Sequence, residues 1–93
     1  MGNLLINVSY ANFASPVAKV TARVMNQMFE EEFFIDDGKS KLTKLPNGIY
    51  SVFLAADGFV EEVISSVKSE ENTTTIANAE MFPRSILNLE GSL

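Results

Sequence analysis

Cysteine, histidine and tryptophan are all absent from this chain of 93 residues. Without cysteine, neither a disulfide nor a thiolate-bound metal can hold the fold together, so packing and hydrogen bonds must do so. Without histidine, the chain lacks the side chain that titrates closest to neutral pH and serves most often as a general base. Serine and threonine hydroxyls therefore lack their usual activating partner, and we expect no enzymatic activity.

Basic residues and long apolar runs are scarce as well. Seven lysines and arginines stand against twelve aspartates and glutamates, which gives a formal charge of −5. Such a chain repels phosphate backbones, so no nucleic acid is expected as a partner. No apolar run reaches the roughly 18 residues of a membrane span, and the first residues lack the basic and apolar regions of a signal peptide. We expect no membrane insertion and no signal peptide in this chain.

A two-residue periodicity runs through the sequence. NLLINVSY at residues 3–10 places apolar side chains on one face and mostly polar ones, with Leu5 among them, on the other. AKVTARV at 18–24 alternates in the same way. Strand side chains alternate between two faces, whereas a helix would repeat every three to four residues. The chain is therefore predicted to be all-β. In GIYSVFLA, three residues are expected to enter the core: Tyr50, Val52 and Leu54.

Turn signals separate these segments. DDGK at residues 36–39 predicts a tight hairpin, because glycine accepts the positive φ that such turns require. PNG at 46–48 and DG at 57–58 mark two further turns, and the polar SEEN at 69–72 marks another. The segments together predict about seven short strands, which is typical of a β-sandwich.

The acidic and aromatic residues at 29–35 fit this pattern less well. Glu31 falls on the same face as Phe33 and Ile35. An edge position or a β-bulge would relieve that conflict. Glu30 and Glu32 point to the other face, and we interpret the three glutamates as solvated edge charges that suppress aggregation.

Pro83 closes the last predicted strand, because proline cannot donate to a β-ladder. We therefore expect a sandwich domain at residues 1–83. Residues 84–93 are expected to form a tail, a linker or an extra edge strand, and the sequence does not decide among these.

The segment KLPNGIYSVFLAADGF resembles the motif of the carboxypeptidase regulatory-like domain family, a group of transthyretin-like β-sandwiches. That motif runs Leu-Pro-x-Gly-x-Tyr, then alternating apolar residues, then glycine and an aromatic residue. The similar positions here are Leu45, Pro46, Gly48, Tyr50, Val52, Leu54, Gly58 and Phe59. SPVAKVTARV at 15–24 is similar to the family's second strand, whereas DDGKSKLT fits its Thr-Asp-x-x-Gly segment only loosely. With the strand count, the resemblance implies a single Ig-like or transthyretin-like sandwich of about seven antiparallel strands with Greek-key connections.

The resemblance also implies a role without catalysis. Family members usually accompany enzymes, adhesins or outer-membrane receptors as scaffolds, spacers or binding modules. We therefore expect a non-enzymatic module of a larger secreted or cell-surface protein that contacts protein or glycan and needs no cofactor. The alternative is a free-standing structural subunit, such as a virion or appendage component, that assembles through its edge strands. An inhibitor with a presented loop has less support, because no loop here is long.

Few side chains suggest a site. Asp36 and Asp37 could hold Ca²⁺, but two carboxylates fall short of the several oxygen ligands that this ion takes, so a turn is the better interpretation. We assign no catalytic, cofactor-binding or metal-binding residue. The best candidates for an exposed contact surface are Phe13, in a loop, and Phe34, opposite the inner face of its strand. Packing in the core or on a sheet face is the competing interpretation for both.

A related group, the collagen-adhesin B-type domains, joins a first-strand lysine to a last-strand asparagine with help from a glutamate. Here residues 3–10 contain no lysine, and Leu54 stands where that glutamate would be expected. We predict that this chain forms no such isopeptide bond. Intact-mass spectrometry should return the mass of the sequence, and a loss of one ammonia would contradict the prediction.

Overall fold

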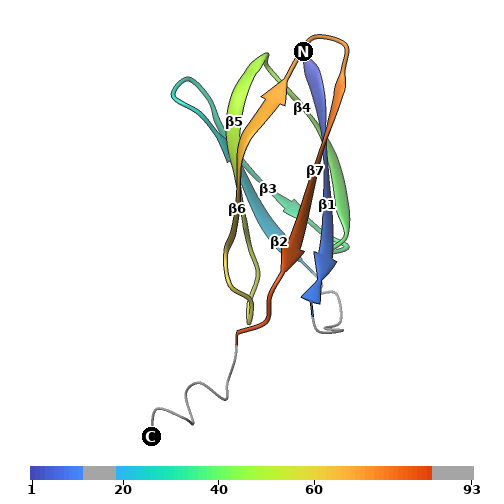
Figure 1. Cartoon of the computed structure of the whole chain (residues 1–93), viewed down its shortest axis with the longest axis vertical. Coiled ribbons are helices and arrows are strands. Elements are labelled where there is room, and N and C mark those ends of the chain that lie inside the picture. The colour runs from blue at the N-terminus through green and yellow to red at the C-terminus, as the bar shows by residue number, and fades with distance from the viewer. Residues whose placement is uncertain (12–18, 85–93) are drawn as a thin grey trace, which may run out of the picture.

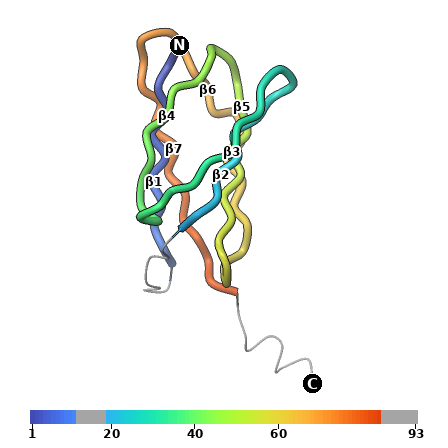
Figure 2. The backbone as a smooth tube through the Cα atoms, turned by 180° about the vertical axis from the view of Figure 1, so that it is seen from behind, coloured from blue at the N-terminus to red at the C-terminus, as the bar shows by residue number. Residues whose placement is uncertain are grey.

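The computed structural model of the chain describes residues 1–11 and 19–84 (Figure 1). None of these residues belongs to a helix long and apolar enough to cross a bilayer. The described residues form two sheets that face each other as the layers of a sandwich (Figure 2). The predicted all-β sandwich is therefore confirmed. Its strands are β1 (Gly2–Tyr10), β2 (Val20–Met25), β3 (Glu30–Ile35), β4 (Ser40–Leu45), β5 (Gly48–Ala55), β6 (Glu62–Ser69) and β7 (Thr74–Met81).

The strands are shared unequally between the sheets. Sheet A has three strands in the order β4-β1-β7, and sheet B has four in the order β3-β2-β5-β6. Only two pairs of consecutive strands, β2–β3 and β5–β6, are hydrogen-bonded neighbours. Every other connection passes from one sheet to the other, which gives the sandwich its crossed topology.

The turn at residues 36–39 differs from the predicted hairpin. Gly38 has the expected positive φ of 67°, and its N–H donates to the Ile35 carbonyl at 3.0 Å. However, β3 belongs to sheet B and β4 to sheet A, so the turn carries the chain between the layers. The local signal for a turn was right, but the pairing of its two flanking strands was wrong, because pairing depends on partners distant in sequence.

One strand pair departs from the predicted antiparallel arrangement. β1 and β7 run parallel, in register from Asn3 opposite Thr74 to Tyr10 opposite Met81. All other strand pairs in the described residues are antiparallel. A parallel pair needs a long crossover connection, and here that connection is the rest of the domain. The first strand therefore starts at one end of the sandwich, and the last strand ends at the other (Figure 1).

The core lies between the inner faces of the two sheets. The alternation seen in the sequence is kept, and Tyr50, Val52 and Leu54 point inward as predicted. Buried residues come from both layers, so neither sheet has a complete core of its own. The largest contributors are Tyr50, Leu4, Ile6, Ile35, Leu45, Leu54, Met81, Val20, Val24 and Val52.

Tyr50 places a hydroxyl at the rim of this core. The Tyr50 hydroxyl donates to the Pro46 carbonyl oxygen at 2.6 Å, and the Phe29 ring packs edge-on against the Tyr50 ring at 5.8 Å. A buried hydroxyl without a partner would cost roughly 1 to 3 kcal/mol, so this bond keeps the placement favourable. Burial raises the pKa of the Tyr50 phenol.

The edge position of β3 explains how Glu31 can share a face with apolar residues. It lies at the edge of sheet B, and its register with β2 continues without a break from Ile35 to Glu30. Glu31 shares the inward phase with Ile35 but is exposed, because the strand lies at the open side of the sandwich. The edge alternative is therefore the correct one, and no bulge is needed.

A bulge occurs on β6 instead. The register with β5 shifts between Tyr50 and Val52, so that Ser65 and Ser66 together oppose one residue of β5. Ser66 has a φ of 60°, the left-handed region that costs energy for residues other than glycine. Bulges of this kind twist a strand and interrupt its edge.

The close approach of β1 and β6 requires glycine at one end of the sandwich. A β-carbon on Gly2 would overlap the Glu70 carbonyl oxygen and the Ser69 hydroxyl. Ser69 is itself buried, and its hydroxyl donates to the Leu45 carbonyl at 3.2 Å. The two sheets therefore meet closely at the end where β1 begins, with no room for a larger residue.

The described part of the chain closes with contacts at Pro83 and Arg84. β7 stops at Met81, Pro83 forms an isolated bridge with Phe59, and the Arg84 N–H donates to the Gly58 carbonyl at 2.8 Å. Residues 85–93 lie outside the described residues. The division into a domain at 1–83 and a tail at 84–93 stays a prediction.

The placement of Leu54 generates a stability prediction. Leu54→Ala should destabilise the protein by roughly 2 to 5 kcal/mol, because it opens a cavity in a fully buried position. Ile49→Ala is the matched control on the same strand, since Ile49 is 60% exposed and its loss should change stability by less than about 0.5 kcal/mol. Urea unfolding of both variants measures the difference. Equal effects would contradict the assigned faces of β5.

Asp37 generates a prediction about pH. Its carboxylate accepts hydrogen bonds from the backbone N–H groups of Lys39 at 2.8 Å and Ser40 at 3.1 Å. These bonds, first that from Lys39, lower the pKa of the Asp37 carboxyl below 3.8. The ionised Asp37 carboxylate therefore contributes its full stabilisation of the folded state well above pH 3.8. That contribution is lost as the pH falls through the lowered pKa of the folded protein.

Asp37→Asn should remove this titration and flatten the acid side of the stability curve. The control Asp36→Asn removes the same formal charge but neither hydrogen bond, so it should retain the acid-side loss. Unfolding measured across a pH series would test both. If the two variants gave the same curve, the hydrogen bonds would not be the cause.

Candidate interaction surface

Phe34 lies on the outer face of sheet B. The side chain is 46% exposed, and the Lys19 ammonium lies 4.3 Å from the centre of the Phe34 ring. A cation over an aromatic face is attracted to the ring and holds it in place at the surface. Phe34 is therefore exposed on a sheet face, and its contact with a partner stays a prediction. Phe13, the other predicted contact residue, lies outside the described residues.

A second cation stacks on the same face of sheet B. The Arg23 guanidinium lies 5.1 Å from the centre of the Phe53 ring, and its Nη1 lies 3.9 Å from Oε2 of Glu30. Arg23 is paired in register with Phe53 on one side and Glu32 on the other. Such exposed charge pairs contribute little to stability. They do order the rings and charges that a partner would meet.

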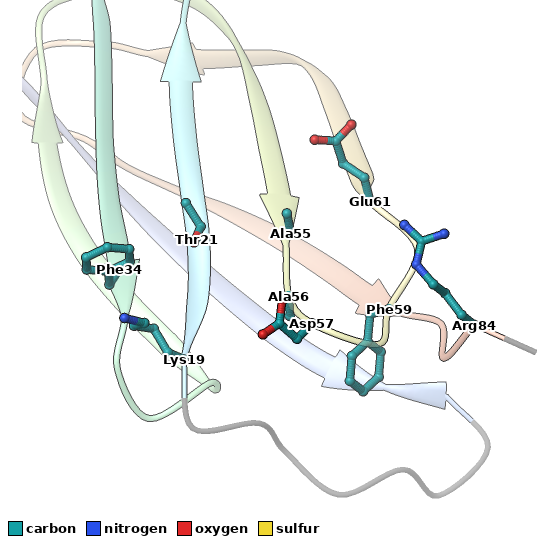
Figure 3. A pocket seen from close by; sticks show the side chains of 9 residues that line it. All are labelled: Lys19, Thr21, Phe34, Ala55, Ala56, Asp57, Phe59, Glu61 and Arg84. Atoms are coloured by element: carbon teal, nitrogen blue, oxygen red, sulfur yellow. The ribbon is translucent and has the colours of Figure 1, made fainter.

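An open hollow of about 750 Å³ lies beside Phe34 at one end of sheet B (Figure 3). In Figure 3, Lys19 and Phe34 lie on one side of the hollow, whereas Glu61 and Arg84 lie on the other. Opposite charges are balanced around it, with two basic and two acidic side chains. The residues that line it are Lys19, Thr21, Phe34, Ala55, Ala56, Asp57, Phe59, Glu61 and Arg84.

The hollow combines an aromatic ring, a stacked cation and both signs of charge. Among the described residues, no group of three or more histidine, cysteine or carboxylate side chains is placed to hold a metal ion. Asp36 and Asp37 adjoin the turn between the sheets, and the Asp37 carboxylate already accepts two backbone hydrogen bonds there.

The outer face of sheet A carries an apolar row that the sequence analysis missed. Leu5 of β1 lies in register with Leu42 of β4 and with Ile76 of β7, and these three side chains share the outer face. Leu42 is 59% exposed and Ile76 is 58% exposed. In the sequence, only Leu5 hinted at this row, because it is an apolar residue among the otherwise polar alternate positions of residues 3–10.

Uncharged polar residues flank this apolar row. Asn7 donates to the side-chain oxygen of Asn78 at 3.2 Å on one side of the row. Asn3 and Thr74 are register partners on the other side, and their side chains are 3.5 Å apart. On β4, Lys44 is the register partner of Asn3 and lies on the same face, so one positive charge also borders the row. The row itself is short.

Comparison with known proteins shows the fold and no family. No family model matches the sequence, and no curated protein matches it either. Among solved structures, the Bacillus anthracis TIE protein is similar with a TM-score of 0.64 and 23% identity over 88% of this chain. A chain of a type II cohesin–X-dockerin complex from Acetivibrio cellulolyticus is similar with a TM-score of 0.66 and 11% identity over 89% of this chain.

A third similar structure is a bacterial adhesin from Mobiluncus mulieris that contains intramolecular disulfide, isopeptide and ester cross-links. Its TM-score is 0.51, with 15% identity over 90% of this chain. The chain spans 16%, 58% and 42% of the lengths of the three similar chains, respectively. At such identities, the likeness shows a β-sandwich fold that also occurs in bacterial adhesin and cohesin-complex structures.

Proposed function

We propose that the chain is a non-enzymatic spacer and protein-contact module of a larger secreted or cell-surface protein. The observation that carries this proposal is the parallel pairing of β1 with β7. Because the two strands run in the same direction, the chain enters at one end of the sandwich and leaves at the other (Figure 1). Domains connected in this way extend a chain along its axis.

The same pairing suits a module under tension. A pull on the start of β1 and the end of β7 loads the ladder from Asn3–Thr74 to Tyr10–Met81 in shear. The hydrogen bonds between the two strands are then strained together. A pull that separates the strands at one end would instead break these bonds one after another. Sheet A therefore has the geometry of a load-bearing element between two neighbouring domains.

Other features support a module without catalysis. The chain has no histidine or cysteine, and the hollow beside Phe34 has balanced charges and an aromatic wall. Similar solved structures include a cohesin–dockerin complex and an adhesin, which supports protein partners and an extracellular setting. We assign Phe34, with Phe13, to the contact surface, and we expect no cofactor and no metal.

The family proposal follows from the motif. The segment from Leu45 to Phe59 resembles the carboxypeptidase regulatory-like domains, and we propose membership of that transthyretin-like group on this basis. A glycan partner is a weaker proposal, since the chain has no tryptophan and the exposed rings carry stacked cations. The second candidate function is a structural subunit that assembles through its edge strands, which the neutral edge of β7 favours.

Single-molecule pulling tests the load-bearing role. Because the chain lacks cysteine, handles can be attached at introduced cysteine pairs without interference. Asn3→Cys with Glu80→Cys pulls the β1–β7 ladder in shear, whereas Asn3→Cys with Thr74→Cys pulls register partners apart at one end. We expect the shear pair to unfold at a several-fold higher force. Equal forces for the two pairs would overturn the proposed spacer function.

A further inference from the structure

Four strands have one side that no described strand pairs with, and three of these edges are protected. β3 carries glutamates at 30–32, all exposed. β4 carries Lys41 and Lys44, and Lys41 is in register with the buried Ile6, so a charge lies on the inward phase of that edge. β6 is interrupted by its bulge at Ser65 and Ser66. Charges, inward-pointing lysines and bulges are the devices by which proteins prevent strand addition.

β7 has none of these devices. It is eight residues long, and its register with β1 continues without a shift from Thr74 to Met81. The run from Thr74 to Ala79 contains no charged residue and no proline. A hollow of about 350 Å³ lies between β6 and β7, which leaves space beside the edge of β7. The Thr75 hydroxyl donates to the Lys68 carbonyl of β6 at 2.5 Å, so a side-chain bond ties the start of β7 to β6. The outward backbone groups of β7 still pair with no described strand, and of the four described edges this one is the least protected.

The backbone groups that face this open edge can be identified. The Asn3 N–H donates to the Thr73 carbonyl at 2.8 Å, so the Thr73 carbonyl points toward β1. The Ala79 carbonyl, which accepts from the Ser9 hydroxyl at 3.3 Å, points the same way. The N–H and C=O groups of successive residues in a strand point to alternate sides within the sheet. Those of the even-numbered residues of β7 therefore point away from β1, toward the open edge. These residues are Thr74, Ile76, Asn78 and Glu80.

We propose that the open edge of β7 pairs antiparallel with the same edge of a second copy of this chain, with Ile76 of each copy on the two-fold axis. The two three-stranded sheets then form one continuous sheet of six strands. This inference rests on the proposed function, because it names the partner and the surface through which a module of this kind makes protein contact.

The symmetry of the edge favours a second copy over an unrelated peptide. Two chains that each carry −5 repel one another, but the stretch of β7 from Thr74 to Ala79 is uncharged. With Ile76 opposite Ile76, Glu80 of one copy lies opposite Asn72 of the other, which keeps the two copies of Glu80 apart but brings each near Glu71. The apolar row of Leu42, Leu5 and Ile76 then continues into the same row of the second copy, which an identical chain supplies by symmetry.

The pairing buries a small area and should be weak. One added ladder and one apolar row fall at the low end of specific interfaces, so we expect dimers at roughly 100 μM protein. In a protein displayed at high density or in an array, such weak contacts add together.

Charge substitution with a matched control tests the edge. Ile76→Lys places a charge on the open edge and should shift the sedimentation profile at roughly 100 μM from dimer to monomer. Leu42→Lys makes the same change at the other end of the row, and the two side chains are almost equally exposed, Leu42 at 59% and Ile76 at 58%. Most of the Leu42→Lys protein should therefore remain dimeric. Thermal melts check that both variants fold. Loss of the dimer in both variants to the same extent would overturn edge pairing.

Cysteine cross-linking tests the register. Directly opposed residues of a hydrogen-bonded antiparallel pair have Cα atoms about 5.5 Å apart, which a disulfide can span. Ile76→Cys should therefore yield a covalent dimer on mild oxidation, because the chain has no other cysteine. Leu42→Cys, equally exposed but on the opposite edge strand, should yield several-fold less.

The outcomes separate this inference from the proposed function. A wild-type chain that stays monomeric at about 1 mM, with no preferential cross-link at residue 76, would overturn the pairing. The pulling experiment uses single molecules and does not depend on the edge of β7. A monomer that still resists shear would support the spacer function and contradict the edge pairing. A dimer with no shear resistance would contradict the spacer function and support the edge pairing.

Discussion

The pairing of β1 with β7 is the interaction on which the rest of the structure depends. β1 is the central strand of sheet A, with β4 on one side and β7 on the other, so sheet A exists only when both pairs form. Leu4 and Ile6 of β1 enter the core, and the buried Ala77 of β7 lies in register with Ile6. Without this pair, the inner face of sheet B would have nothing to cover it, since each layer alone leaves its apolar side in water.

Alternation in the sequence predicted the inward-facing side chains of β5, whereas on the edge strands Glu31 and Lys41 share the inward phase and are nevertheless exposed. Tyr50, Val52 and Leu54 are buried, and Phe34 is exposed, because a strand in a sandwich has only two faces and the polar residues identify the wet one. The bond from the Tyr50 hydroxyl to the Pro46 carbonyl is likewise local, because the turn before β5 brings that carbonyl close to it. These features are local, and local sequence determines them.

Features that depend on distant partners were not predictable. Nothing near Gly38 shows that its turn joins two sheets, and nothing in β7 shows that its neighbour is parallel. The apolar row through Leu5 appears only when β4 and β7 are placed in register beside β1. The cation over Phe34 comes from Lys19, the residue just before the neighbouring strand β2, so the stacked pair was not foreseeable from the residues around Phe34.

The pairing of the first strand with the last also governs how the chain can reach its fold. Asn7 and Asn78 are hydrogen-bonded although 71 residues separate them, and such distant contacts slow folding because the loop must close first. During synthesis, β1 is made before the other strands of the domain. It cannot pair with β7 until β7, the last strand, has also been made. Until then sheet A is incomplete and one edge of β1 is unpaired, and unpaired strand edges favour misassembly. Speed of synthesis and access to chaperones therefore bear on the yield of this domain.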